Sequence, residues 1–127
     1  MRTRNLDEYE RKLLESWEDV YKKGQLTLWI MLALKDGPKH MEQIKVFIGR
    51  FTNDTMVADD KSLYRALRRY YDAEMVNFKQ VPSKGGPDLK IYSLNHVGNR
   101  VLETFIRRNI LEVFFQPRIN ELIKVER

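Results

Sequence analysis

Basic side chains are concentrated in the segment KSLYRALRRYYD, residues 61–72, where they are candidates for binding an anionic partner. On a helix that turns about 100° per residue, the apolar residues share one face and the basic residues the opposite one. The apolar face has Leu63, Ala66, Leu67 and Tyr70, and the basic side has Lys61, Arg65, Arg68 and Arg69. The guanidinium of arginine donates paired hydrogen bonds to a phosphate or to a guanine edge. The pattern therefore predicts a helix that packs on one side and offers cations on the other, although an ordinary solvated face has the same pattern.

The other reactive residue types do not combine into a catalytic or metal site. Asp59 and Asp60 stand where the N-cap of this helix belongs, and adjacent carboxylates on a helix do not converge on one substrate. His40 and His96 lack neighbours at metal-ligand spacing. The chain has no cysteine, which excludes disulfides and a thiol nucleophile, and no nucleophile, base and orienting group can be assembled. We therefore expect a protein that is not an enzyme and needs no metal or cofactor.

Composition and charge favour a small basic protein of the cytoplasm. The 127 residues are 43% hydrophobic and 32% charged, which is enough for one compact domain with helical extensions. No apolar run approaches membrane-spanning length, and no apolar segment follows the basic start as in a secretory signal. The net charge is +5, and residues 61–90 hold seven Lys or Arg against three acids. This concentration of positive charge is compatible with nucleic acid as a partner.

Hydrophobic periodicity predicts a largely helical first half. Residues 6–23 repeat apolar side chains every three or four positions, and Gly24 can end that helix. Residues 26–35 (LTLWIMLALK) are apolar on nearly all sides, so neighbouring elements must enclose this helix. The residues DGP at 36–38 end this helix. A polar connection at 52–60 leads into the basic helix. The intervening segment spaces Met41, Ile44, Phe47, Ile48 and Phe51 as a second amphipathic helix.

The pattern changes after the basic helix. The short segments MVNFKQV and LKIYSL are rich in β-branched and aromatic residues, and PSKGGPD joins them. This predicts a hairpin with a long, glycine-rich tip that includes Lys84. A long helix follows over residues 95–115, with Asn95 as N-cap, and a last short helix follows Pro117. This order of elements is typical of a winged helix-turn-helix, an α+β fold that is mostly α, whose third helix enters the major groove of DNA.

Three segments in this order resemble the PadR family of transcriptional regulators. They are GPKH at the start of the supporting helix, LYRALRR in the basic helix, and YSLNHVGNRVL from strand to helix. The resemblance covers roughly residues 26–102. It implies a homodimer, with dimerising terminal helices, that binds a palindromic operator, usually as a repressor. It also implies that Tyr64 and the start of the basic helix approach DNA. Two departures are Glu74, where the family commonly has glycine after this helix, and the long connection at 52–60.

The terminal helices are expected to form a dimer interface. The segment 101–115 has too many apolar residues for one contact face: Val101, Leu102, Phe105, Ile106, Ile110, Leu111, Phe114 and Phe115. A monomer would leave a large apolar patch exposed. We therefore expect an N-terminal dimerisation helix at 1–24, a winged-helix domain at 25–94 and C-terminal dimerisation helices at 95–127. Trp17 and Trp29 could also stack on a planar small-molecule effector, as in some relatives, but plain packing is the interpretation we favour.

These observations together predict a sequence-specific, double-stranded DNA-binding regulator. The DNA-binding candidates are Lys61, Ser62, Tyr64, Arg65, Arg68 and Arg69 on the basic helix, and Lys84 on the hairpin tip. Two alternatives stay open. The winged helix could dock an acidic protein through its basic face, or it could bind DNA without sequence preference, as a chromatin-like protein does.

Overall fold

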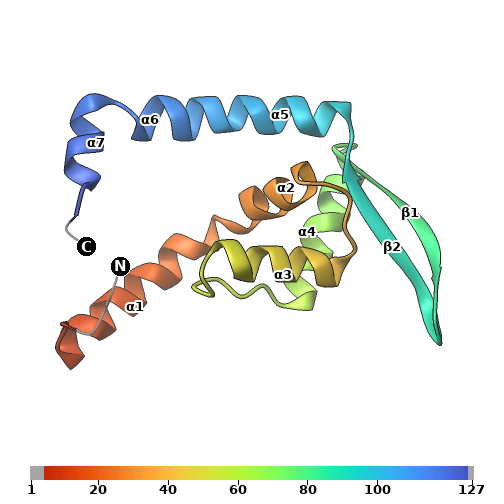
Figure 1. Ribbon diagram of the computed structural model, residues 1–127, viewed down its shortest axis with the longest axis horizontal. Coiled ribbons are helices and arrows are strands. Elements are labelled where there is room, and N and C mark those ends of the chain that lie inside the picture. Colours follow the sequence, from red (N-terminus) through yellow and green to blue (C-terminus); the bar gives the residue numbers. More distant parts are fainter. Residues whose placement is uncertain (1–4, 126–127) are drawn as a thin grey trace. The chain divides into compact units, whose positions relative to one another are not determined.

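The computed structural model describes residues 5–125, which divide into two compact units (Figure 1). One unit is Leu26–Thr104. The other combines the residues up to Gln25 with those from Phe105 onward. None of the helices within residues 5–125 combines the length and apolar character needed to cross a lipid bilayer.

Three helices build the core of the Leu26–Thr104 unit: α2 (Leu26–Lys35), α3 (Met41–Phe51) and α4 (Asp60–Asp72). The sequence predicted α2 and α3 with these bounds, and α4 begins one residue before the predicted segment. Four residues of α2 are buried, as its apolar composition requires: Ile30, Met31, Ala33 and Leu34. Ile44 and Ile48 of α3 and Leu63 and Leu67 of α4 complete the helical core. The expected central position of α2 and the apolar face of α4 are therefore confirmed.

The connection between α3 and α4 is ordered by its own contacts. Met56 and Ala58 are buried. The Thr52 hydroxyl donates to the Ile48 carbonyl over 2.7 Å, and the Met56 N–H donates to the Thr52 hydroxyl over 3.3 Å. Asn53 adopts a left-handed conformation with φ of 53°, which asparagine tolerates better than most residues. The connection is thus longer than a minimal helix-turn-helix turn, yet it is anchored to the core.

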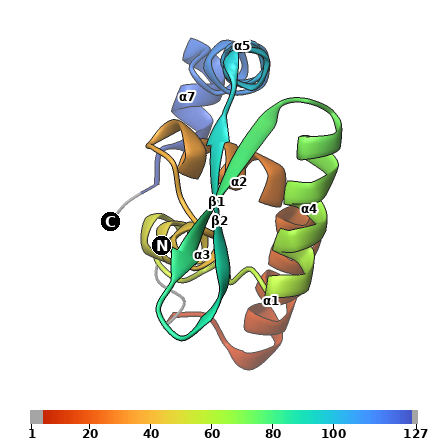
Figure 2. The ribbon, with the colours of Figure 1, turned by 90° about the vertical axis from the view of Figure 1, so that its right-hand side faces the viewer.

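The strands β1 (Val76–Ser83) and β2 (Gly86–Leu94) form an antiparallel hairpin whose strands twist around each other (Figure 2). The sequence predicted the hairpin correctly, but the long tip predicted for it is wrong. Ser83 pairs with Gly86, so only Lys84 and Gly85 lie between the strands, and Gly85 takes a positive φ of 70°. Glycine suits that conformation because it has no Cβ. Polar residues that resembled a loop therefore extend both strands.

Backbone hydrogen bonds join the hairpin to the helices. The Lys39 N–H donates to the Tyr92 carbonyl over 3.0 Å, and the Tyr92 N–H donates to the Lys39 carbonyl over 2.8 Å. This bridge ties β2 to the chain between α2 and α3. It holds the C-terminal part of β2 at a set position relative to the helical core.

Helix α5 (His96–Ile106) follows β2, and its start lies beside the turn that joins α4 to β1. Glu74, just after α4, takes the left-handed conformation with φ of 61°. The Asn95 side chain accepts from the Gly98 N–H over 2.8 Å, which confirms the predicted N-cap. A Cβ on Gly98 would lie 2.1 Å from the Met75 carbonyl oxygen, so only glycine lets α5 approach the start of β1 this closely.

The second unit contains α1 (Glu8–Lys23), η1 (Arg107–Leu111), α6 (Glu112–Phe114) and α7 (Pro117–Ile123). Asp7 caps α1, so the helix starts slightly later than predicted. The predicted helix over 95–115 is helical from α5 to α6, but its middle, η1, is a π-helical turn. Pro117 is the first residue of α7, where its missing N–H costs nothing. None of these four elements has a buried residue.

Candidate nucleic-acid interface

The cations of α4 lie on its solvent-exposed face. Lys61, Arg65, Arg68 and Arg69 are all exposed, while Leu63 and Leu67 of the same helix are fully buried. Within residues 5–125, none of these four cations lies within ion-pair distance of a carboxylate. The helix therefore presents positive charge that the described part of the chain does not neutralise. Such a face can donate charge-assisted hydrogen bonds to phosphate oxygens or base edges.

The start of α4 is anchored by two carboxylates. Asp59 Oδ1 accepts from the Ser62 N–H over 2.8 Å, and Asp59 Oδ2 accepts from the Ser62 hydroxyl over 3.0 Å. These bonds to Ser62 lower the pKa of Asp59 below its ordinary value. The Ser62 hydroxyl, a predicted DNA contact, thus serves as a capping partner in this structure.

Asp60 links the start of α4 to α3. Its Oδ1 accepts a hydrogen bond from Lys45 Nζ over 2.9 Å. This bond, opposed by desolvation and helped by the nearby negative charges, raises the pKa of Lys45. The pair positions the first turn of α4 on the supporting helix, and it uses the one acidic residue in that turn.

Lys84 lies at the hairpin tip, where its side chain is exposed. The hairpin therefore places one of the predicted site residues on a different element from the other six. His40 caps α3, and its Nδ1 accepts from the Gln43 N–H over 3.4 Å.

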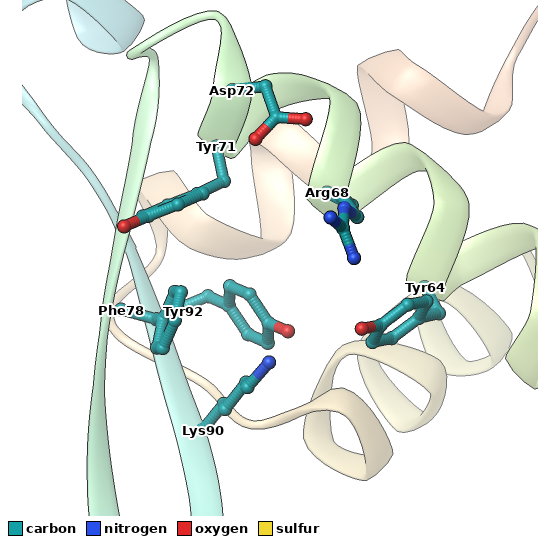
Figure 3. Close-up of a pocket in the computed structure, with 7 residues that line it drawn as sticks. All are labelled: Tyr64, Arg68, Tyr71, Asp72, Phe78, Lys90 and Tyr92. Carbon is teal, nitrogen blue, oxygen red and sulfur yellow. The ribbon is translucent and has the colours of Figure 1, made fainter.

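Sequence reasoning missed a hollow between α4 and the hairpin (Figure 3). Its volume is about 130 Å³. Its walls come from four residues predicted on the basic helix and from strand residues that were not singled out. The lining residues are Tyr64, Arg68, Tyr71, Asp72, Phe78, Lys90 and Tyr92.

Aromatic rings connect the two elements around this hollow. The ring centroids of Tyr71 and Phe78 are 4.8 Å apart, and those of Phe78 and Tyr92 are 5.7 Å apart. Phe78 pairs with Tyr92 across the hairpin, and Lys90 lies two residues from Tyr92, hence on the same face of β2. That alternation was visible in the sequence, but the register that brings Phe78 opposite Tyr92 was not.

Lys90 is held over the aromatic rings. Its Nζ lies 4.8 Å from the centroid of Phe78 and 5.7 Å from that of Tyr64, within the range of cation–π attraction. Tyr92 is only 6% exposed. Burial, and to a smaller extent the neighbouring Tyr64, raise the pKa of the Tyr92 hydroxyl, so this hydroxyl stays a neutral hydrogen-bond donor near neutral pH.

The remaining candidates lie apart from this face. Trp17 is 73% exposed on α1 and does not pack in the core of its own chain. The core packing that was favoured for it is therefore wrong. Trp29 is half-buried in α2. Among residues 5–125, no group of three or more His, Asp or Glu side chains could hold a metal ion.

Comparison with known proteins gives structural neighbours only. No protein-family model matches the sequence, and no curated protein matches it. Among solved structures, a PadR-like transcription factor from Bacteroides fragilis is similar at 24% identity and a TM-score of 0.59, over 85% of this chain and 95% of the other. A PadR-like transcriptional regulator from Bacillus cereus is similar at 20% identity and a TM-score of 0.62, over 83% of this chain and 97% of the other.

A third neighbour was solved with DNA. It is Bacillus subtilis PadR in complex with operator DNA, at 19% identity and a TM-score of 0.60, over 66% of this chain and 48% of the other. At these identities the likeness establishes the fold. The chain is a winged helix-turn-helix of the kind found in PadR-like transcriptional regulators, which confirms the predicted fold class.

Proposed function

We propose that this protein is a PadR-type transcriptional regulator that binds double-stranded DNA through α4 and the hairpin. The observation that supports this most directly is the exposed cationic face of α4, which lacks carboxylate partners within residues 5–125. In a winged helix-turn-helix this helix is the one that enters the major groove. The structural neighbour solved with operator DNA shares the fold and supports the same assignment.

The proposed contacts fall into two groups. Lys61, Arg65, Arg68 and Arg69, with Tyr64, would contact bases and phosphates from α4, and Ser62 would join them by exchanging its bond to Asp59. Lys84 would reach the backbone or the minor groove from the hairpin tip, because the two-residue loop leaves its side chain free to extend.

We further propose that the protein acts as a homodimer on a palindromic operator, as a repressor. Support comes from the helices outside the winged-helix unit, which expose large apolar side chains. Those on α1 are Tyr9, Leu13, Trp17, Val20 and Tyr21, and those beyond α5 include Leu111, Phe114, Phe115, Leu122 and Ile123. Water-exposed apolar surface of this kind favours association. A twofold dimer would place two copies of α4 in successive major grooves about 34 Å apart.

A gel shift under two salt conditions tests this function. The probes are the promoter upstream of the protein's own gene and a scrambled duplex of equal length and composition. We expect tight binding to the promoter, weaker binding to the scrambled duplex, and a steep loss of affinity as salt rises, because phosphate contacts release counterions. Equal affinity for both probes would indicate a non-specific DNA binder. No binding to either probe would favour a protein-docking role for the basic face.

A further inference from the structure

The hollow between α4 and β2 collects four hydrogen-bond donors that point toward one another (Figure 3). The Arg68 guanidinium and the Tyr64 hydroxyl enter it from α4. Lys90 Nζ and the Tyr92 hydroxyl enter it from β2. Two cations and two phenols around about 130 Å³ form a set that suits an anion with several acceptor oxygens.

The charge of the lining limits which anion fits. Arg68 and Lys90 contribute two positive charges and Asp72 one negative charge, so the hollow has a net charge of +1. A phosphodiester has a single negative charge and two free oxygens, which matches both the charge and the donors. A dianion would leave one charge uncompensated beside the Asp72 carboxylate.

Lys90 is positioned for a ligand rather than paired within the chain. No carboxylate of residues 5–125 lies within ion-pair distance of it. The rings of Phe78 and Tyr64 hold its ammonium group while leaving its three N–H donors available. The side chain is half-buried, so little further ordering is needed when an anion binds.

We propose that this hollow binds one phosphodiester of the DNA backbone, with Lys90 and Arg68 as its charged ligands; the proposal rests on the DNA-binding function above. Arg68 lies at the border between the exposed face of α4 and the side that faces the hairpin, whereas Arg65 lies one turn away on the open face. The hollow therefore assigns Arg68 to the backbone and leaves Arg65 for base edges. A phosphate bound by both α4 and β2 would set the angle at which the helix enters the groove.

Lys79 provides the control for Lys90. It lies next to Phe78 on β1 and is exposed, so its side chain projects from the opposite face of the hairpin. Lys79→Gln and Lys90→Gln remove the same charge from neighbouring positions, but only Lys90→Gln removes a ligand of the hollow. Thermal unfolding followed by circular dichroism checks that both variants are folded.

The first measurement is equilibrium binding of full-length protein to promoter and scrambled duplexes over a range of salt concentrations. We expect Lys90→Gln to weaken binding to both duplexes by a similar factor, roughly tenfold, and to reduce the slope of log K against log salt by about 0.9. Asp72→Asn should tighten binding to both duplexes, because it removes the negative charge from the hollow. Equal losses for Lys79→Gln and Lys90→Gln would overturn the site and show only general electrostatic attraction.

The second measurement uses promoter duplexes in which one phosphate at a time is replaced by an uncharged methylphosphonate. At one position per half-site, the replacement should weaken DNA binding by the wild-type protein clearly more than binding by Lys90→Gln, which has already lost one of the two charged ligands of that phosphate. If Lys90→Gln is weakened at every position as much as the wild type, the hollow does not bind a phosphate. If the wild type binds no duplex at all, the proposed function itself fails, and this site with it.

Discussion

The Asn95 side chain joins the end of α4 to the start of α5 by donating from Nδ2 to the Glu74 carbonyl oxygen over 2.6 Å. Its Oδ1 simultaneously caps α5 by accepting from the Gly98 N–H, and the Asn95 N–H donates to the Met75 carbonyl. One residue thus satisfies backbone groups in a turn and at a helix end, which would otherwise have to find water.

We predict that Asn95→Ala lowers the free energy of unfolding by about 1–2 kcal/mol, because it removes an N-cap and the bond to the turn. Urea unfolding monitored by circular dichroism measures this change. Asn77→Ala is the matched control, since it removes only the 3.3 Å contact with Asn95 Nδ2, and its effect should stay below about 0.5 kcal/mol. Similar losses in both variants would show that the cap does not stabilise this junction.

Replacing Glu74 by glycine should stabilise the folded protein. The positive φ of 61° at Glu74 costs a residue with a Cβ about 1–2 kcal/mol. Glycine avoids this cost, but its greater flexibility in the unfolded chain offsets up to about 1 kcal/mol of the gain. Glu74→Gly is therefore expected to raise the free energy of unfolding by as much as about 1 kcal/mol. Ala73→Gly, at a φ of −81°, should lower it instead. A loss of stability in Glu74→Gly would contradict this account of the turn.

Acid should weaken the cap of α4 through Asp59. Hydrogen bonds from Ser62 lower the pKa of this carboxyl relative to its ordinary value of 3.8. The resulting stability is fully present above that ordinary value and is lost as the pH falls through the lower pKa of the folded state. Carboxyl chemical shifts in an NMR titration should give a midpoint for Asp59 below 3.8. Ser62→Ala keeps the larger contribution, the backbone N–H bond, and removes only the hydroxyl bond. Its midpoint should therefore move part of the way up toward the ordinary value, and an unchanged midpoint would exclude the Ser62 hydroxyl as a cause.

Substitutions of Arg65 and Arg50 should distinguish a base-edge contact from general electrostatic attraction to DNA. We predict that Arg65→Ala weakens promoter binding by about 1–3 kcal/mol and weakens scrambled-duplex binding much less, as loss of a base-edge contact should. Arg50→Ala removes the same charge from an exposed position of α3 and should change both affinities little. Titrations by fluorescence anisotropy on both duplexes distinguish these outcomes. Equal losses on the two duplexes would reassign Arg65 to the phosphate backbone.

Trp17 tests the proposed dimer. Because its side chain is 73% exposed on the apolar face of α1, Trp17→Glu would place a charge in the expected interface and should shift the protein toward monomer. Size-exclusion chromatography with light scattering measures the mass. Arg11→Glu changes a charge on the polar side of the same helix and should leave the mass unchanged. A wild-type protein that is monomeric at micromolar concentration would contradict the proposal.

Local patterns in the sequence were sufficient for most of the fold. Helices α3 and α4 were predicted because their apolar residues repeat with the helical period, and buried residues such as Leu63 and Leu67 confirm it. Helix α2 was predicted from a segment that is apolar on nearly all sides. The Asp59 cap was predictable because its partner lies three residues away. The predicted length of the hairpin tip was wrong because Ser83 and Gly86, residue types that are common in loops, pair with each other in the strands.

The charged face of α4 was therefore determined by the sequence itself, since every residue of that face lies within one helix and a fixed rotation per residue places it. The hollow beside this face was decided by the tertiary structure alone. Lys90 meets Tyr64 and Arg68 only because the strand register puts Phe78 opposite Tyr92 and the Lys39–Tyr92 bridge holds β2 against the helices. Such contacts between distant segments depend on how strands pair and pack, and no local periodicity encodes them.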